Sequence, residues 1–295
     1  MACFYPLDAY RLDSGEIVFT KEGDGRPLIL PCGRCIGCRL ERSRQWAMRC
    51  VHEAQCHDAN SFVTLTYDEA HFEPSLVYKD FALFMRRLRK RVLHPRFYMC
   101  GEYGENTLRP HFHALLFNVG FPDRYPWRMS GTGFQLYRSP LLEELWTAGQ
   151  SEVGDVSFES AAYVARYVMK KVTGDLAGPH YTRVVSETGE VVQVVPEFCH
   201  MSRGIAREWI RRYNGEVYRG DGDAYCVVNG MKVKPPRYYD LWMDAHDLGS
   251  SEMDEVRHDR FKRSLLARDD STPERLAVRE TVTRARLRFK CRNLE

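Results

Sequence analysis

Apolar and polar positions alternate along the first two thirds of the chain in patterns that predict both strands and helices. Ser61–Tyr67 alternates β-branched and aromatic side chains with polar ones, which is typical of a strand with one buried face. Apolar residues recur every three to four positions over about Arg39–His57, Tyr78–Val92 and Glu159–Val172. This period predicts three amphipathic helices.

Shorter segments between these helices complete the pattern of a mixed domain. They are expected strands at Arg96–Gly101, His111–Asn118 and Asp155–Phe158, a short helix at Leu141–Ala148, and a loop rich in proline, glycine and aromatic residues at Phe121–Pro140. The resulting order is strand, helix, strand, strand, helix, strand, helix, with hairpin-length links. It predicts an α+β fold, in which an antiparallel β-sheet carries helices packed on one face.

The C-terminal third has a weaker pattern. A helix is expected at about Ile205–Tyr213, a hairpin around the turn Asn229-Gly230, and two charged helices at about Ser251–Arg268 and Pro273–Arg292. We therefore predict a cysteine-rich N-terminal arm over residues 1–60, a central domain over 61–173, and a helical, basic accessory region over 174–295.

Composition narrows the class of protein. Hydrophobic residues make up 44% and charged residues 28% of the 295 residues, as in ordinary globular proteins, and no stretch has the length of a membrane span. The N-terminus has no basic segment followed by an apolar one, so we expect a cytosolic protein without a secretory signal. A net charge of +3 does not by itself indicate nucleic acid as a partner.

The first residues with chemistry are His111 and His113, on the predicted strand His111–Asn118. Side chains two apart on a strand project from the same face, so two imidazoles stand side by side and can bind a divalent cation. Glu102 is the best third ligand, because a partner strand ending there would bring a carboxylate beside the histidines; His94 is a weaker one. The alternative is that both histidines are polar residues on a solvated sheet face.

A second pattern lies on the predicted helix Glu159–Val172. Tyr163 and Tyr167 are four residues apart, so their hydroxyls project from one helix face, and Lys170 follows near the same side. A phenol with a pKa of about 10 is a poor nucleophile. A cation beside a scissile phosphate, together with a lysine, can compensate for this. The alternative is that the tyrosines are ordinary core or rim aromatics.

Ten cysteines in a chain without a secretory signal indicate metal binding or burial rather than disulfides. Cys32, Cys35 and Cys38 form a Cys-x-x-Cys-x-x-Cys run that predicts three ligands of a structural zinc ion. An iron–sulfur cluster and three unliganded thiols are the alternatives. The possible fourth ligands, of which Cys3 and Cys50 are preferred, are Cys3, Cys50, His52, Cys56 and His57.

Basic residues gather in two places. Residues 257–292 contain twelve lysines and arginines against five acidic residues, and the second group lies on the predicted helix Tyr78–Val92. Such arrays attract phosphate backbones, although each alone could be a solvated helix face. The residues expected to contact DNA are Arg86, Arg87, Arg89, Lys90 and Lys171. Aromatic residues of the loop Phe121–Pro140, which could stack on unpaired bases, are Tyr125, Trp127, Phe134 and Tyr137, with Arg128 among them.

Three motifs in order carry a resemblance to a known family. Phe62–Tyr67, Arg109–His113 and Tyr163–Lys170 resemble the three signatures of the HUH endonucleases, and more narrowly those of the two-tyrosine rolling-circle replication initiators of microviruses, especially gokushoviruses. The resemblance covers about Ser61–Lys171. Pro31–Cys38 is also similar to the phage branch, whereas the C-terminal third offers no recognisable motif.

The resemblance implies an HUH or ferredoxin-like nuclease core and an enzyme that nicks single-stranded origin DNA by tyrosine attack. It implies a 5′-phosphotyrosine link, strand rejoining by the second tyrosine, and Mg²⁺ or Mn²⁺ held by two histidines and a carboxamide or carboxylate. Its expected setting is the cytoplasm of a bacterial host, with a host DNA polymerase. No Gly-x-x-x-x-Gly-Lys-Ser/Thr phosphate loop occurs, so a host helicase is expected to unwind the DNA. Alternatives are a non-catalytic zinc-stabilised DNA-binding protein, or another HUH enzyme such as a transposase or relaxase.

Overall fold

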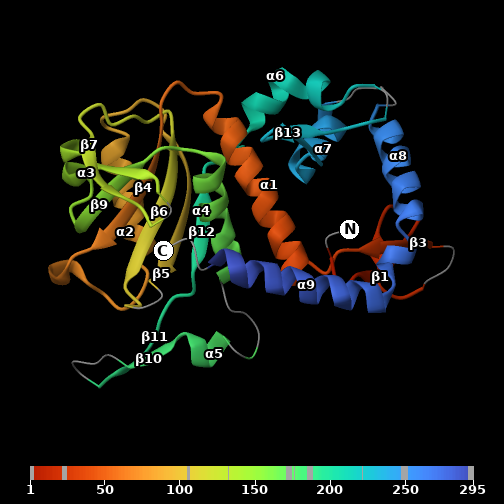
Figure 1. Cartoon of the computed structure of the whole chain (residues 1–295), viewed down its shortest axis with the longest axis horizontal. Coiled ribbons are helices and arrows are strands. Elements are labelled where there is room, and N and C mark those ends of the chain that lie inside the picture. Colours follow the sequence, from red (N-terminus) through yellow and green to blue (C-terminus); the bar gives the residue numbers. More distant parts are fainter. Residues whose placement is uncertain are drawn as a thin grey trace.

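The computed structural model describes most of the chain (Figure 1). The described ranges are residues 3–21, 25–104, 107–131, 133–170, 175, 177–184, 189–220, 222–246 and 252–291, without the side chains of 167–170 and 288–291.

A seven-stranded antiparallel sheet forms the centre of the fold, in the order β12-β5-β6-β4-β9-β8-β7. Its strands are β4 (Asn60–Tyr67), β5 (Arg96–Tyr103), β6 (Pro110–Phe117), β7 (Tyr125–Met129), β8 (Gln135–Arg138), β9 (Gly149–Gly154) and β12 (Phe198–Met201). β4, β5 and β6 agree with the expected strands, and their hairpin pairing confirms the α+β class with an antiparallel sheet.

Helices cover both faces of this sheet, whereas the sequence predicted one helical layer. On one face pack α2 (Tyr78–Leu88) and α3 (Pro140–Leu145), and on the other α1 (Ile36–Ala54) and α4 (Phe158–Lys170) (Figure 1). The reason is that both sides of β6 are apolar. Phe112 and Leu116 enter the core under α2, while Leu115 and Phe117 enter the core under α1 and α4.

The position of β9 corrects the expected strand at Asp155–Phe158. The polar segment Gly149–Gly154 forms the strand and pairs with β4, and Phe158 already begins α4. Gly149 makes this pairing possible at φ +150°, because a Cβ there would lie 2.3 Å from the backbone nitrogen of Asp68. Hydrogen bonding to a central strand therefore outweighs the low β-propensity of this segment.

The expected loop at Phe121–Pro140 also contains more structure than predicted. β7 and β8 form a hairpin with a register shift between Pro126 and Arg128, and β8 joins the sheet through Tyr137 and Val153. The prolines and glycines hid this hairpin in the sequence. As a result the sheet extends along the β9 edge, beside the start of α4.

The first residues and the last helix lie together. A three-stranded sheet is built from β1 (Leu7–Arg11), β2 (Ile17–Val18) and β3 (Arg26–Leu30). It lies near the start of α1, where α9 (Pro273–Cys291) also passes (Figure 1).

The remaining elements precede α9. They are α5 (Ala177–His180), β10 (Thr182–Val184), β11 (Val191–Gln193), α6 (Arg207–Val217), β13 (Cys226–Val228), β14 (Met231–Val233), α7 (Arg237–His246) and α8 (Glu252–Leu266). Asn229 and Gly230 both have positive φ between β13 and β14, which confirms the predicted hairpin turn. No described helix combines the length and hydrophobicity that crossing a bilayer requires.

Candidate active site

Glu102, His111 and His113 converge on the face of the sheet that α4 covers. Strand register places Glu102 of β5 directly opposite His111 of β6. Glu102 Oε1 lies 2.6 Å from His111 Nε2 and 3.0 Å from His113 Nε2. One ligand atom from each residue lies within 4.8 Å of the other two. The predicted grouping of two imidazoles and a carboxylate is thus present, and it is the donor set of a divalent cation site.

The backbone and a neighbouring strand orient both imidazole rings. His111 Nδ1 lies 3.1 Å from the carbonyl oxygen of Arg109, and Thr64 Oγ1 on β4 lies 3.0 Å from His113 Nδ1. A carbonyl only accepts hydrogen bonds, so His111 Nδ1 carries the proton in this contact. Each ring therefore turns its Nε2 atom toward Glu102, which is how outer hydrogen bonds prepare histidines as metal ligands.

Glu102 is held ionised although it is buried. Burial by itself raises the pKa of this carboxyl, but hydrogen bonds from His111 and His113 outweigh that effect and bring the pKa to about 2. The exposed fraction of its side chain is 3%. A carboxylate that keeps its charge in this environment supplies a strong negative donor at the point where the two imidazoles meet.

Helix α4 places a tyrosine beside this cluster. Ala161, Val164 and Ala165 are fully buried against the sheet and α1, so their spacing fixes which helix face is directed inward. Ser157 and Ser160 exchange hydrogen bonds between side chain and backbone at the start of the helix, as in a capping box.

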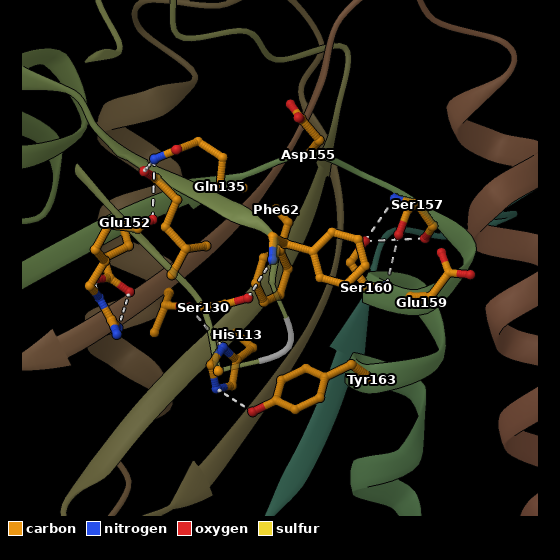
Figure 2. A pocket seen from close by; sticks show the side chains of 16 residues that line it. Phe62, His113, Ser130, Gln135, Glu152, Asp155, Ser157, Glu159, Ser160 and Tyr163 are labelled. Carbon is orange, nitrogen blue, oxygen red and sulfur yellow. Dashed lines mark hydrogen bonds and ion pairs between the residues drawn. The ribbon is translucent and has the colours of Figure 1, made fainter. Parts of the chain in front are cut away.

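Tyr163 is half-buried, and its hydroxyl lies 3.4 Å from His113 Nε2 (Figure 2). The Phe62 ring stacks on His113 at a centroid distance of 5.6 Å and meets Tyr163 edge-on at 6.2 Å. These aromatic contacts hold the phenol and the imidazole in a fixed mutual orientation. A nucleophile of the predicted type therefore touches the predicted metal ligands.

A cavity of about 520 Å³ opens directly beside His113 and Tyr163 (Figure 2). Its size is in the range of small-molecule sites, roughly 300–1,000 Å³. Its apolar walls are Phe62, Phe134 and Leu136. It lies between the β7–β8 hairpin, the end of β9 and the start of α4, so the corrected positions of β7, β8 and β9 create it.

The polar lining of this cavity is hydroxylic and acidic. Ser130, Ser157 and Ser160 contribute hydroxyls, and Asp155 and Glu159 contribute carboxylates. A further pair in the lining is neutralised internally, because the Arg128 guanidinium binds both carboxylate oxygens of Glu152 at 2.7 and 3.0 Å. This lining offers many hydrogen-bond acceptors and little net positive charge.

Three predicted residues cannot be compared side chain by side chain. Tyr167 and Lys170 belong to α4, but their side chains lie outside the described residues, and Lys171 lies outside them entirely. Their proposed roles stay predictions.

The basic residues of α2 lie away from the cluster. α2 packs on the opposite face of the sheet from α4, and Arg87 donates a hydrogen bond to the Leu145 carbonyl oxygen at 3.0 Å. The predicted DNA contacts of Arg86, Arg87, Arg89 and Lys90 are therefore not brought together with Tyr163. His94, the weaker metal candidate, precedes β5 at the end opposite Glu102 and is not a member of the cluster.

The cysteine run lies in a separate place, at the start of α1. Cys32, Cys35 and Cys38 meet Cys3 there. Cys50 is instead buried in the core under α1 and α4.

Thr64, the Arg109 carbonyl and the cavity-lining role of Phe62 were not predicted from the sequence. Thr64 and Phe62 share the face of β4 that pairs beside His113, a relation fixed by strand register. Alternation on Ser61–Tyr67 could have suggested that face, but the partner strand was not predictable from spacing alone.

Comparison with known proteins gives a consistent result. The family model described as replication-associated protein ORF2 matches residues 60–172. Replication-associated protein VP4 of Bdellovibrio phage phiMH2K is 35% identical over 257 residues, which span 82% of this chain and 77% of the relative.

Two further relatives carry similar names. Replication-associated protein ORF2 of Spiroplasma virus 4 is 29% identical over 91% of this chain and 89% of its own length. Replication-associated protein ORF4 of Chlamydia phage 1 is 34% identical over 81% of this chain and 59% of its own length. No solved structure matches the chain.

Proposed function

Since this chain belongs to the family of replication-associated proteins of microviruses, we propose that it initiates rolling-circle replication by nicking single-stranded origin DNA. The nick leaves a 5′-phosphotyrosine on the protein and is later resealed by strand transfer. The observation that carries the proposal is the contact between the Tyr163 hydroxyl and His113, a member of the cluster with Glu102 and His111.

Two imidazole nitrogens and one carboxylate oxygen fit a divalent cation, and the preparation of both Nε2 atoms supports that use. Nitrogen ligands suit Mn²⁺ better than Mg²⁺, which prefers oxygen, so Mn²⁺ is the ion that this donor set favours. His111, His113 and Glu102 would hold the ion. When bound, it supplies a Lewis acid that polarises the scissile phosphoryl oxygen.

The chain's own residues orient the nucleophile. The phenolic oxygen of Tyr163 forms the bond to phosphorus while the bond from phosphorus to the 3′ oxygen breaks. The phenol proton passes to water, and the departing 3′ oxygen takes up a proton, so that the products are a 5′-phosphotyrosine and a free 3′-hydroxyl. Packing of Phe62 against both Tyr163 and His113 limits the motion of the phenol, which supports attack from a fixed position.

The free 3′-hydroxyl is the end from which a host DNA polymerase extends, with a host helicase unwinding the duplex, in the cytoplasm of the bacterial host. Tyr167 is proposed to cut the regenerated origin after one round, because it lies one turn along α4 from Tyr163. The strand end released by that second cut closes the circle.

The cavity beside Tyr163 is proposed to receive a base that neighbours the scissile phosphate. Phe62 and Phe134 offer aromatic surface for stacking, and the carboxylates of Asp155 and Glu159 would repel a phosphate. Carboxylates accept hydrogen bonds from exocyclic amino groups, so this lining favours cytosine, adenine or guanine over thymine.

We expect Phe134→Ala to weaken binding of single-stranded origin DNA by about 1–3 kcal/mol, or roughly 5- to 150-fold in Kd, because one stacking surface is removed. Fluorescence anisotropy of a labelled oligonucleotide measures this. The matched control is Trp127→Ala, since Trp127 is on the same hairpin, is 53% exposed against 51% for Phe134, and does not line the cavity. Equal losses in both variants would contradict a specific base site.

The proposed function is tested by incubating the protein with Mn²⁺ and single-stranded DNA that carries the phage origin. We expect a protein–DNA adduct that survives denaturation, together with a free fragment that a polymerase can extend. If no origin sequence yields an adduct while the oligonucleotides still bind, the protein is a DNA-binding protein without this chemistry. Adducts formed equally on unrelated sequences would instead argue against origin-specific initiation.

A further inference from the structure

Four cysteines bring their sulfur atoms together where the N-terminal sheet meets α1. The ligand atoms of Cys3, Cys32, Cys35 and Cys38 all lie within 4.8 Å of one another, and the Sγ atoms of Cys3 and Cys35 are 3.9 Å apart. This exceeds a disulfide bond of about 2.05 Å, and all described cysteines are free thiols. Tetrahedral zinc with zinc–sulfur bonds of about 2.3 Å places its sulfurs about 3.8 Å apart, which matches this spacing.

Backbone N–H groups point at three of these sulfurs. The amides of Cys32 and Cys35 donate to the Sγ atoms of Cys3 and Cys32 at 3.2 and 3.3 Å. Cys35 Sγ accepts from the amides of Phe4 and Cys38 at 3.4 and 3.5 Å. Cys35 is also the residue that caps the start of α1. Donors of this kind and the positive end of a helix stabilise thiolates, which are the form of cysteine that binds metal.

We propose that Cys3, Cys32, Cys35 and Cys38 bind a structural zinc ion. Four protein ligands complete a tetrahedral site and leave no position for substrate, so the ion has a structural role. This site is separate from the cluster of Glu102, His111 and His113, and the proposal does not depend on the nuclease function.

The structure identifies Cys3 as the fourth ligand among the alternatives that the sequence left open. Cys50 is fully buried under α4, and burial raises the pKa of its thiol, which disfavours the thiolate. Cys56 lies beyond the far end of α1 and donates a hydrogen bond to the carbonyl oxygen of His52.

The zinc ion would join three parts of the chain. Cys3 precedes β1 and Cys32 follows β3, so the N-terminal sheet is closed into a loop whose two ends meet at the ion. Leu276 of α9 packs against the same cysteines, and the Tyr5 hydroxyl bonds to Glu280 of α9 at 2.5 Å. The ion thereby fastens the first strands and the last helix to the start of α1, the helix that packs along α4 (Figure 1).

The test measures the metal content of the purified full-length chain together with its X-ray absorption spectrum. The His111→Ala/His113→Ala double variant is measured in parallel, so that zinc bound at the candidate active site is not counted. We expect about one zinc ion per chain in this variant, surrounded by four sulfurs at about 2.3 Å. A chain that binds no zinc after reconstitution under reducing conditions, or zinc with nitrogen and oxygen neighbours only, would overturn the proposal.

Single variants identify the fourth ligand. Cys3→Ser is expected to replace one sulfur by oxygen or to lose the zinc, whereas Cys56→Ser, the control beyond the far end of α1, keeps one zinc with four sulfurs. If Cys3→Ser does not fold, the spectrum of the unaltered cysteine site still decides the donor set. Iron with inorganic sulfide and visible absorption in anaerobically purified protein would overturn zinc in favour of an iron–sulfur cluster.

Discussion

Tyr163→Phe is expected to abolish the covalent adduct with origin DNA and to slow single-turnover cleavage by about 10³-fold or more, because it removes the attacking oxygen. The ring and its contacts with Phe62 are retained, so Kd for the oligonucleotide should stay within about twofold. Quenched-flow cleavage of a labelled strand gives the rate, and denaturing electrophoresis gives the adduct.

Two further tyrosine variants make this result specific. Tyr167→Phe should retain the first cleavage, because the phenol in contact with His113 is unchanged, but should fail in strand rejoining. Tyr213→Phe on α6 is the matched control, remote from the candidate active site, and should behave as the unaltered protein. If Tyr167→Phe alone abolished the first adduct while Tyr163→Phe retained it, the order assigned to the two tyrosines would be wrong.

Glu102→Gln is expected to lower the cleavage rate by about 10²–10³-fold and to raise the Mn²⁺ concentration for half-maximal activity at least about tenfold. The change is nearly isosteric, but it removes the negative charge that faces His111 and His113. Titration of cleavage with Mn²⁺ separates the effect on metal affinity from the effect on rate. Saturating Mn²⁺ should therefore restore part of the activity.

The neighbouring strand residue provides the control. Phe112 lies between the two histidines in sequence but is fully buried in the core on the opposite face of the sheet. Phe112→Leu should lower the free energy of unfolding by about 1 kcal/mol and leave the Mn²⁺ requirement unchanged. Cleavage by Glu102→Gln at the unaltered rate in the presence of a chelator would show that this cluster does not support the reaction.

Local pattern was sufficient for much of the site. Alternation on β6 predicts that His111 and His113 share one face and that Phe112 occupies the other, because the side-chain period of a strand is fixed by its geometry. Helical spacing likewise predicts one inward face on α4. The choice of Glu102 followed from a short hairpin link, which constrains the register of its two strands.

Elements that depend on distant partners were predicted less well. Gly149–Gly154 is polar and glycine-flanked, and it is a strand because β4 offers it a partner. The β7–β8 hairpin has exposed residues throughout β7, so it lacks the buried face that identifies a strand in sequence. The second helical layer arises because α1 and α4 bury the remaining apolar side of the sheet.

The sequence by itself determined the chemical groups, their order, and which of them share a face within one strand or helix, because these relations follow from backbone geometry over a few residues. Only the tertiary structure decided that Tyr163 meets His113, that Thr64 orients this imidazole, and that Cys3 joins Cys32, Cys35 and Cys38. These contacts join segments far apart in the chain, and packing and strand register, rather than local propensity, bring such segments together.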